Sequence, residues 1–263
     1  MENINMQIVI IGAGNMATQL GRAFREKDFP IVQVYSRTLS AAEALGKELQ
    51  TDYTNQLQQI VSDADLYIFS VKDTALPSLL QSFPAVGGLW AHTAGSLPID
   101  IFKDSAATRY GVFYPLQTFS KNRKISFERI PIFTEANNPA DQELLEQIAG
   151  SLSNQVIPLS SEKRKYLHLA AVFACNFTNH LYDIAAQILE SQDIDWKVLL
   201  PLIEETAAKV QALSPGEAQT GPAVRKDVSV IEKHLGMLED DLGKWEIYRG
   251  LSRSICHLVH PFF

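Results

Sequence analysis

The stretch from residue 8 to residue 17 constrains the fold of this chain more than any other. It reads Ile-Val-Ile-Ile-Gly-Ala-Gly-Asn-Met-Ala, an apolar run of β type that ends in glycines and passes directly into a helical pattern. Gly12 suits the tight turn that leaves a strand, Gly14 lets the backbone approach a pyrophosphate, and Ala17 permits close packing of helix on strand. The stretch therefore predicts the first turn of a dinucleotide-binding fold, where N–H groups at a helix start face phosphates.

The motif alone is weak evidence, because glycine turns between a strand and a helix also occur without a ligand. Its surroundings strengthen it: an amphipathic stretch follows the glycines, and residues 31–35 form a second β-type run at the expected distance. We therefore favour nucleotide binding over a purely structural turn. We expect Asn15 and Met16, at the helix start, to contact the pyrophosphate together with Gly12 and Gly14.

The second β-type run ends at Ser36, Arg37 and Thr38, where an NAD-selective fold usually carries an acidic residue for the ribose hydroxyls. One guanidinium and two hydroxyls suit the additional 2′-phosphate of NADP. The alternative is that Arg37 is an ordinary solvated loop residue. Given the glycine motif upstream, we favour phosphate binding and predict NADP as the cofactor.

Composition excludes several other classes of function. The net charge of −7 argues against nucleic acid or an anionic membrane surface as the main partner. Cys175 and Cys256 are the only cysteines, and no Cys/His cluster accompanies them, so we expect no metal site and a cytoplasmic location. No apolar run reaches the roughly 20 residues needed to span a bilayer.

β-type runs alternate with helical patterns as far as residue 158, which predicts an α/β fold with a doubly wound, mostly parallel sheet of Rossmann type. The apolar runs at residues 66–71 and 89–93 are typical of parallel strands buried on both faces. Ligands of such sheets bind beyond the carboxyl ends of the strands. We therefore expect the turns after these two runs to contact the cofactor, through Ser70, Val71, Lys72, Thr93, Ala94 and Gly95.

From residue 160 onward the pattern is helical throughout. We therefore predict an NADP-binding Rossmann domain at residues 1–159 and an all-helical C-terminal domain at residues 160–263, used for dimerisation and substrate binding. Its first helix, at residues 162–190, carries apolar residues that we expect to bury most of its circumference. These apolar residues are Leu169, Val172, Phe173, Phe177, Leu181, Ile184 and Ile188.

A narrower polar stripe follows the same helix through Lys165, His168, Asn176, Asn179 and Asp183. It could be a plain solvent-facing side. We favour a function for it, because Asn and His are poor helix formers and Lys or Glu would serve a wet face better.

A Gly- and Pro-rich stretch at residues 214–227 interrupts the helical half, and such a loop is usually functional or disordered. Arg225 could hold an anionic substrate or a phosphate. For Asp227 we favour capping of the following helix over a catalytic role.

Six segments of the chain carry a resemblance to a known family. They are residues 12–17, 36–38, 92–96, 114–119, 176–181 and 220–227. The chain resembles an uncharacterised bacterial family that joins a Rossmann-like domain to a C-terminal helical domain of unknown function. It is also similar to pyrroline-5-carboxylate reductase and to deazaflavin-dependent NADP oxidoreductases, which implies a reductase that dimerises through its helical half. This chain has Tyr114 where related dehydrogenases have a catalytic His, and Lys226 where a Gly is common.

The preferred interpretation is an NADP-dependent oxidoreductase that transfers hydride between NADPH and a small C=O or C=N substrate. Of the candidate catalytic residues His168, Asn176, Tyr114 and Arg225, His168 is the first choice of proton donor, because imidazole titrates near neutral pH, and Tyr114 is the second. The alternative is a non-catalytic protein that binds NADP as a sensor. A methyltransferase also uses a glycine-rich first turn, but Arg37 in place of an acid counts against it.

Overall fold

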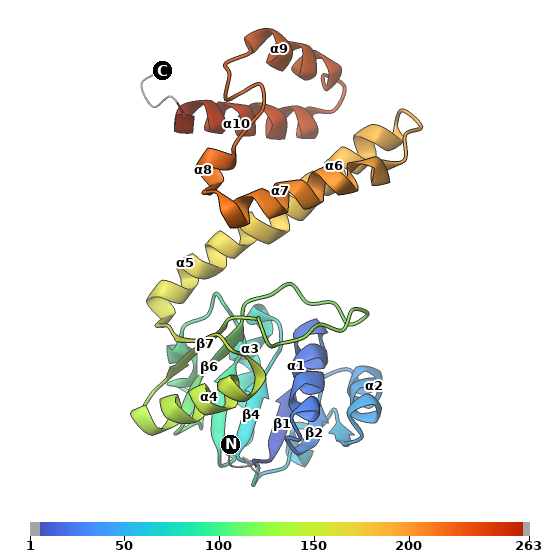
Figure 1. Cartoon of the computed structure of the whole chain (residues 1–263). Helices are drawn as coiled ribbons and strands as arrows, with labels where there is room; N and C mark the ends of the chain where they lie inside the picture. Colours follow the sequence, from blue (N-terminus) through green and yellow to red (C-terminus); the bar gives the residue numbers. More distant parts are fainter. Residues whose placement is uncertain (1–5, 260–263) are drawn as a thin grey trace. The chain divides into compact units, whose positions relative to one another are not determined.

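The computed structural model describes residues 6–259 (Figure 1). By its internal contacts the chain divides into two compact units, Met1–Asn176 and Phe177–Phe263. The first holds every strand of the described residues, and we call it the sheet unit. The second is the helical unit.

The sheet unit is built on one eight-stranded sheet in the order β3-β2-β1-β4-β5-β6-β7-β8. Neighbouring strands from β3 to β6 are parallel, β7 is antiparallel to β6, and β8 is parallel to β7. This confirms the predicted mostly parallel α/β sheet. The strands are β1 (Ile8–Ile11), β2 (Ile31–Tyr35), β3 (Asp52–Thr54), β4 (Leu66–Phe69), β5 (Leu89–His92), β6 (Tyr110–Pro115), β7 (Ile132–Ala136) and β8 (Val156–Pro158).

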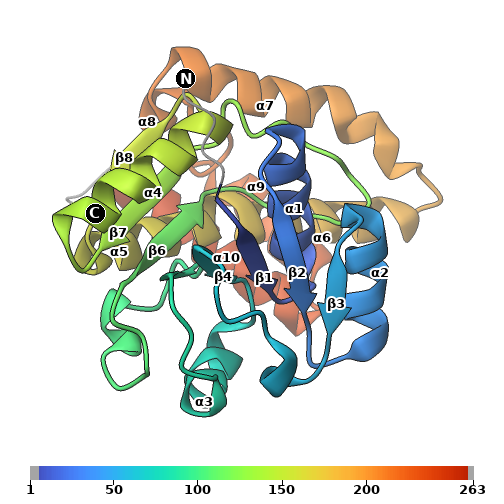
Figure 2. The ribbon, with the colours of Figure 1, turned by 90° about the horizontal axis from the view of Figure 1, so that it is seen from below.

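Helices cover both faces of this sheet (Figure 2). One face packs against α1 (Asn15–Glu26), α2 (Leu39–Leu49) and α4 (Pro139–Leu152), and the other against α3 (Leu76–Ser82) and the 3₁₀ turn η3 (Ile99–Phe102). Alternate side chains of one strand enter the two cores: Ile10 lies in the first core, and Ile11 in the second. Every residue of β1 is buried, which explains why its sequence is apolar without alternation. Two short 3₁₀ turns, η1 (Leu57–Gln59) and η2 (Asp73–Ala75), complete the connections.

The helix expected at residues 162–190 forms with a π-helical stretch in its middle. It comprises α5 (Ser161–Ala171), the π-helical stretch (Val172–Phe177) and α6 (Thr178–Glu190). π-helical turns inside α-helices occur frequently at functional sites. The division between the two units falls within this stretch, so α5 belongs to the sheet unit. The domain boundary at residues 159 and 160 follows the end of β8 and stays a prediction.

The helical unit continues with η5 (Trp196–Leu199), α7 (Leu200–Ala212), α8 (Pro215–Ala218), α9 (Val228–Met237) and α10 (Leu242–Val259). Pro201 lies in the first turn of α7, where a missing N–H costs nothing. None of the described helices has the length and apolar character needed to cross a membrane.

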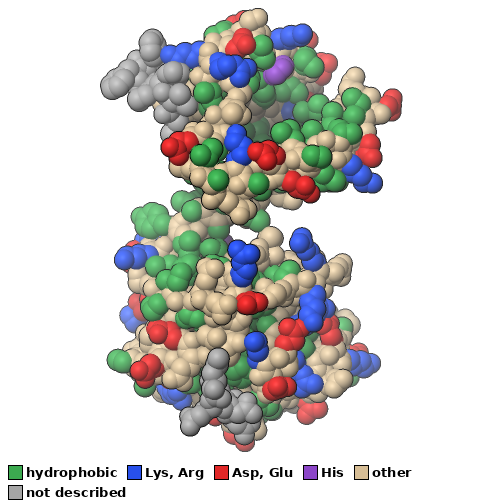
Figure 3. Space-filling view, in the orientation of Figure 1, with side chains coloured by type: hydrophobic (Ala, Val, Ile, Leu, Met, Phe, Trp, Pro, Cys, Tyr) green, Lys and Arg blue, Asp and Glu red, His purple; other side chains and the backbone are tan. Residues whose placement is uncertain are grey.

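The expectation that the apolar residues of residues 162–190 are buried is wrong for the single chain. Phe173 is 61% exposed, Leu169 54% and Phe177 49%. Across residues 177–257 Ala223 is the single buried residue. Figure 3 shows apolar side chains, in green, on the surface of the helical unit.

Candidate functional site

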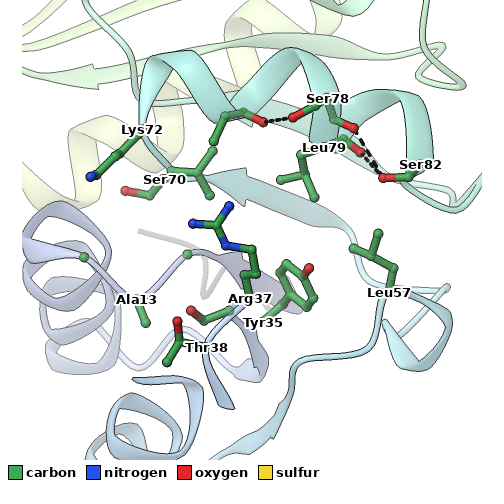
Figure 4. A pocket seen from close by; sticks show the side chains of 15 residues that line it. Ala13, Tyr35, Arg37, Thr38, Leu57, Ser70, Lys72, Ser78, Leu79 and Ser82 are labelled. Atoms are coloured by element: carbon green, nitrogen blue, oxygen red, sulfur yellow. Dashed lines mark hydrogen bonds between the residues drawn. The ribbon is translucent and has the colours of Figure 1, made fainter. Parts of the chain in front are cut away.

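The first candidate site is a cavity of about 440 Å³ at the carboxyl ends of β1, β2 and β4. Eight of the predicted cofactor residues line it: Gly12, Gly14, Ser36, Arg37, Thr38, Ser70, Val71 and Lys72. The remaining lining residues are Ala13, Tyr35, Leu57, Ala75, Ser78, Leu79 and Ser82 (Figure 4). The structure thus brings together turns that lie far apart in the sequence.

Gly12 and Gly14 of the first turn are glycines for different physical reasons. Gly12 has a φ of +124°, and a Cβ at this position would lie 2.1 Å from the carbonyl oxygen of Ser70. Only glycine fits there. A Cβ at Gly14 would meet no atom within 4 Å, so Gly14 keeps the space beside the turn open.

The start of α1 is free to bind an anion. Gly14 is its N-cap and supplies no side-chain hydrogen bond, and the first turn contains no acidic residue. The first N–H groups of a helix lack partners within the helix, and the helix dipole is positive at this end. Asn15 is exposed and Met16 half-buried at this helix start, although neither lines the cavity.

Two cationic side chains line the same cavity. Arg37 is exposed and projects toward Ser70 in Figure 4, and no ion pair involves it within the described part of the chain. Lys72 is the second cation. Thr38 is the N-cap of α2 and makes no side-chain capping bond, so the start of this helix also offers N–H groups. The arrangement suits a phosphate.

The cavity wall also contains residues that sequence reasoning did not identify. Tyr35, Leu57 and Leu79 provide apolar surface, and burial raises the pKa of the Tyr35 hydroxyl while the Arg37 charge acts in the opposite direction. Ser78 and Ser82 are four residues apart on one face of α3. That spacing was visible in the sequence but is common on solvent-facing helices.

A second cavity of about 400 Å³ lies within the sheet unit and contains three of the predicted catalytic residues. Its lining residues are Tyr114, Leu116, Gln117, Thr118, His168, Ala171, Val172, Ala174, Cys175 and Asn176. The hydroxyl of Tyr114 and Nδ1 of His168 are 3.2 Å apart, and the two rings meet edge to face. Burial raises the pKa of Tyr114, whereas the charge of Arg164 acts to lower it.

The turn at Thr93, Ala94 and Gly95 does not line the first cavity. The turn is buried, and it contacts residues of both cavities. On the side of the first cavity, Thr93 Oγ1 donates to Ser70 Oγ at 3.3 Å. A Cβ at Gly95 would lie 2.6 Å from His168 Nδ1 and 2.7 Å from Tyr114 Cζ. The absence of a side chain at Gly95 therefore lets this turn contact the Tyr114–His168 pair.

A buried ionic network holds α5 against the sheet. Arg164 is fully buried, lies one helical turn before His168, and forms an ion pair with Glu135 of β7 at 2.6 Å. Its other terminal nitrogen donates to the Leu97 carbonyl at 2.7 Å and to Ser161 Oγ at 3.0 Å. Sequence reasoning missed Arg164, because a cation within the run Lys163 to Lys165 is expected to face solvent.

His92, at the end of β5, is also fully buried. Burial lowers its pKa to about 3, and the nearby Arg164 charge acts in the same direction. Its Nδ1 accepts a hydrogen bond from the N–H of Ala94 at 3.1 Å. His92 is therefore a neutral structural histidine at physiological pH.

The remaining residues of the polar stripe do not form one face of the site. Lys165 is exposed and pairs with Glu162, while Asn179 and Asp183 belong to the helical unit. Asp183 accepts a hydrogen bond from Gln187 at 2.9 Å, one turn further along α6. Of the stripe, His168 and Asn176 line the second cavity.

The loop before α9 behaves partly as predicted. Asp227 caps α9 by accepting a hydrogen bond from Val230 N–H at 3.3 Å, which confirms the capping role. Lys226 has a φ of +53°, so the conformation that favours glycine is kept although the residue is lysine. Arg225 is exposed in the helical unit and stays a predicted substrate contact.

The described residues contain no group of three His, Cys, Asp or Glu side chains that could hold a metal ion.

Sequence comparison matches two parts of the chain to families. Residues 7–93 match a family described as NADP oxidoreductase coenzyme F420-dependent, and residues 130–255 match a domain of unknown function, DUF2520. The crystal structure of a proposed NADP oxidoreductase from Bacteroides fragilis is 47% identical, over 97% of this chain and 100% of that chain, with a TM-score of 0.92. The chain belongs to this two-domain oxidoreductase family.

More distant structures share the fold of this family member. A pyrroline-5-carboxylate reductase from Streptococcus pyogenes is 14% identical over 99% of this chain and 100% of its own, with a TM-score of 0.66. An imine reductase from Myxococcus stipitatus, solved with NADP⁺, is 17% identical over 97% of this chain and 93% of its own, with a TM-score of 0.64. At these identities the likeness shows the fold alone.

Among curated proteins, a glutamyl-tRNA reductase from Caldivirga maquilingensis is 30% identical over 76 residues, which is 28% of this chain. The matched region covers 19% of that enzyme's length. Its activity and substrates are therefore not transferred to this chain.

Proposed function

We propose that this protein is an NADP-dependent reductase that transfers hydride from NADPH to a small C=O or C=N substrate. The observation that carries the proposal is the first cavity, where Arg37, without an ion-pair partner in the described chain, accompanies the Gly12 turn and the open helix start at Gly14. A dinucleotide with a third phosphate matches this distribution of N–H groups and positive charge.

The cofactor phosphates are assigned to two helix starts. Gly12, Gly14 and the N–H groups of Asn15 and Met16 would hold the pyrophosphate. Ser36, Arg37 and Thr38, together with the uncapped start of α2, would hold the 2′-phosphate. Lys72 adds a second positive charge to the cavity.

The second cavity is the proposed substrate site. The turns at Ser70 to Lys72 and at Thr93 to Gly95 would flank the nicotinamide, and the latter contacts the Tyr114–His168 pair. Bound NADPH supplies the hydride, so the protein must supply one proton. Protonated His168 can donate through Nδ1 to the Tyr114 hydroxyl and give the proton on Nε2 to the substrate.

Tyr114 is the second candidate for the proton donor, and its hydroxyl otherwise fixes the orientation of the imidazole. Asn176 lies in the same cavity and can hydrogen-bond to the substrate heteroatom. Arg225 is proposed as a clamp for an anionic substrate group.

The test is a paired titration with NADPH and NADH, followed by reduced-nicotinamide fluorescence, on the wild type and on Arg37→Ala. We expect NADPH affinity to fall about tenfold or more, because a charge-assisted phosphate contact contributes roughly 1.5–3 kcal/mol, while NADH affinity stays unchanged. Arg25→Ala removes an equal charge from the exposed last turn of α1 and serves as the matched control. Absence of binding by either nucleotide in the wild type would refute the reductase and the sensor interpretations together.

We also propose that the protein is a homodimer formed through its helical half. Large apolar side chains are exposed there, including Leu202 and Val198 at 63% each. An apolar surface of this kind normally contacts a partner. Sedimentation of the wild type should give twice the chain mass, and Leu202→Glu should shift it toward the monomer. A wild type that sediments as a monomer at micromolar concentration would refute the dimer.

A further inference from the structure

The segment between β6 and β7, residues 116–131, contains no helix or strand. We call it the β6–β7 segment. Its first residues, Leu116, Gln117 and Thr118, form part of the wall of the second cavity. Figure 1 shows the segment, in green, in the sheet unit that also contains α1. What fixes this segment therefore fixes part of the proposed substrate site.

Helix α1 holds the β6–β7 segment at three points along one helix face. Gln19 Nε2 donates to the carbonyl oxygens of Ser120 at 2.5 Å and of Arg123 at 2.9 Å. One turn further, Arg22 donates to the Lys121 carbonyl at 2.8 Å. A further turn along, Glu26 forms an ion pair with Lys124. The positions 19, 22 and 26 share one side of a helix.

Gln19 is the buried member of these three. It is 1% exposed, so removing its amide from water has a cost that its hydrogen bonds to the two carbonyls must offset. Its Oε1 is also buried and has no hydrogen-bond partner among the described residues. The hydrogen bonds that the structure gives this buried amide therefore both go to the β6–β7 segment.

Aromatic packing also anchors the β6–β7 segment to the core. Phe119 stacks on Phe127 with ring centroids 5.7 Å apart, and Phe127 is part of the core beneath α1. At the base of the segment Leu116 N–H donates to the Pro131 carbonyl at 2.8 Å. The segment is thus fastened at its ends and at its middle, whereas Gln117 and Thr118 are exposed.

We propose that Gln19 is a positioning residue: by holding residues 120–123 on α1, it fixes Gln117 and Thr118 as one wall of the substrate cavity. The inference rests on the proposed function, in which the start of α1 binds the pyrophosphate and the second cavity binds the substrate. One helix then fixes the geometry of both sites. The segment acts as a fixed wall, and its polar side chains contribute to substrate selection.

The first experiment measures tryptic cleavage of the folded protein in the wild type and in Gln19→Met, which keeps the length and volume of the side chain. Lys121, Arg123 and Lys124 are exposed in the segment, so cleavage there reports its mobility. We expect cleavage to become at least about tenfold faster in the variant. Cleavage after Lys47 in α2 is the internal control and should keep the wild-type rate.

The second experiment tests the cavity itself without a substrate. Cys175 is half-buried and lines the second cavity. In a Cys256→Ser background, its rate of reaction with an aromatic disulfide reagent should rise several-fold in Gln19→Met. Gln81→Met, on the exposed side of α3, removes an unrelated amide and should leave both rates unchanged.

Three results would overturn the proposal. Equal acceleration of cleavage after Lys47 would mean that Gln19→Met destabilises the whole protein. The test then passes to Arg22→Met, at a partly exposed position of the same helix face. If Arg22→Met does not speed cleavage within the β6–β7 segment alone, the proposal fails. An unchanged Cys175 rate beside faster cleavage would mean that Gln19 does not position the cavity wall. Loss of NADPH affinity in Gln19→Met would mean that Gln19 supports α1 instead. These readouts differ from failure of the proposed function, in which the wild type itself does not bind NADPH.

Discussion

The sheet unit and the helical unit bury their apolar residues to very different extents. In the sheet unit, β1, β4 and β5 are buried at every residue, and aromatic side chains such as Trp90 and Phe102 are fully enclosed. In the helical unit, Ala223 is the single buried residue of residues 177–257. The sheet unit therefore completes its own apolar core, whereas the helical unit leaves large apolar side chains exposed in the single chain.

This difference also separates what each unit contributes to function. Both cavities of the proposed site are lined by residues of the sheet unit. The helical unit contains the loop with Arg225, a proposed substrate contact, and the helices α6 and α7 with their exposed apolar side chains. Four pairs of substitutions follow, beginning with the largest expected effect.

Loss of the Arg164 charge should have the largest cost in the sheet unit. Arg164→Met leaves Glu135 without its ion-pair partner in a largely buried position, and we expect a loss of about 3–5 kcal/mol in the free energy of unfolding. Urea unfolding measures it. The neighbouring Lys165→Met, whose ion pair is exposed, should cause no measurable change. Similar costs for the two variants would contradict the buried role of Arg164.

Matched leucines in the two units should respond differently to truncation. Leu20→Ala creates a cavity in the core beneath α1, where Leu20 is 1% exposed, and should cost about 3 kcal/mol. Leu202→Ala, at 63% exposed, should change the stability by less than about 0.5 kcal/mol at a protein concentration low enough to give monomers. An equal cost at low concentration would show that the helical unit has its own core, and the contrast would fail.

Acid should weaken the sheet unit through His92. Its folded-state pKa of about 3 lies below the value of 6.5 in the unfolded chain, so the unfolded chain binds more protons between these pH values. Stability is therefore full above pH 6.5 and falls as the pH is lowered, by about 2 kcal/mol at pH 5 for this one group. Unfolding at pH 7 and pH 5 should show this loss in the wild type and in His180→Asn, but not in His92→Asn. A His92→Asn variant with the wild-type pH dependence would exclude His92 as its source.

Substitution of the helix caps should have the smallest effect on stability. Asn138 caps α4 in the sheet unit and Asp227 caps α9 in the helical unit, each by accepting a hydrogen bond from a helix N–H. Alanine at either position should cost about 1 kcal/mol locally. Because α4 packs on the core, Asn138→Ala should lower the main unfolding transition, whereas Asp227→Ala should raise amide exchange within α9 alone. An effect of Asp227→Ala on exchange in the strands would mean that the two units unfold together.

Much of the first cavity, the proposed cofactor site, could be predicted because its signals are local. Gly12, Gly14 and the turn at Arg37 follow apolar strands, and the strand order brings those turns to one edge of the sheet. The capping role of Asp227 was predictable for the same reason, since a cap acts within one helical turn. The α3 residues of the cavity carried no such signal.

The second cavity, the proposed substrate site, depended on contacts that no local pattern contains. Tyr114 and His168 are 54 residues apart and meet only because β6 and α5 pack together. Arg164 lies in a run of cations that suggests solvent, but the packing of α5 on the sheet buries it beside Glu135. Burial of the apolar face of residues 162–190 was expected from periodicity, yet periodicity cannot say which surface covers that face.

The sequence by itself therefore determined the glycine turn, the alternation of strands and helices, the change to an all-helical pattern after β8 and the cation, Arg37, that lines the first cavity. These follow from steric limits on the backbone and from the spacing of apolar residues, which act within a few positions of the chain. Only the tertiary structure decided the Tyr114–His168 pair, the burial of Arg164 and the fastening of the β6–β7 segment by Gln19. Those contacts depend on which elements pack against each other, and packing joins residues that are distant in the sequence.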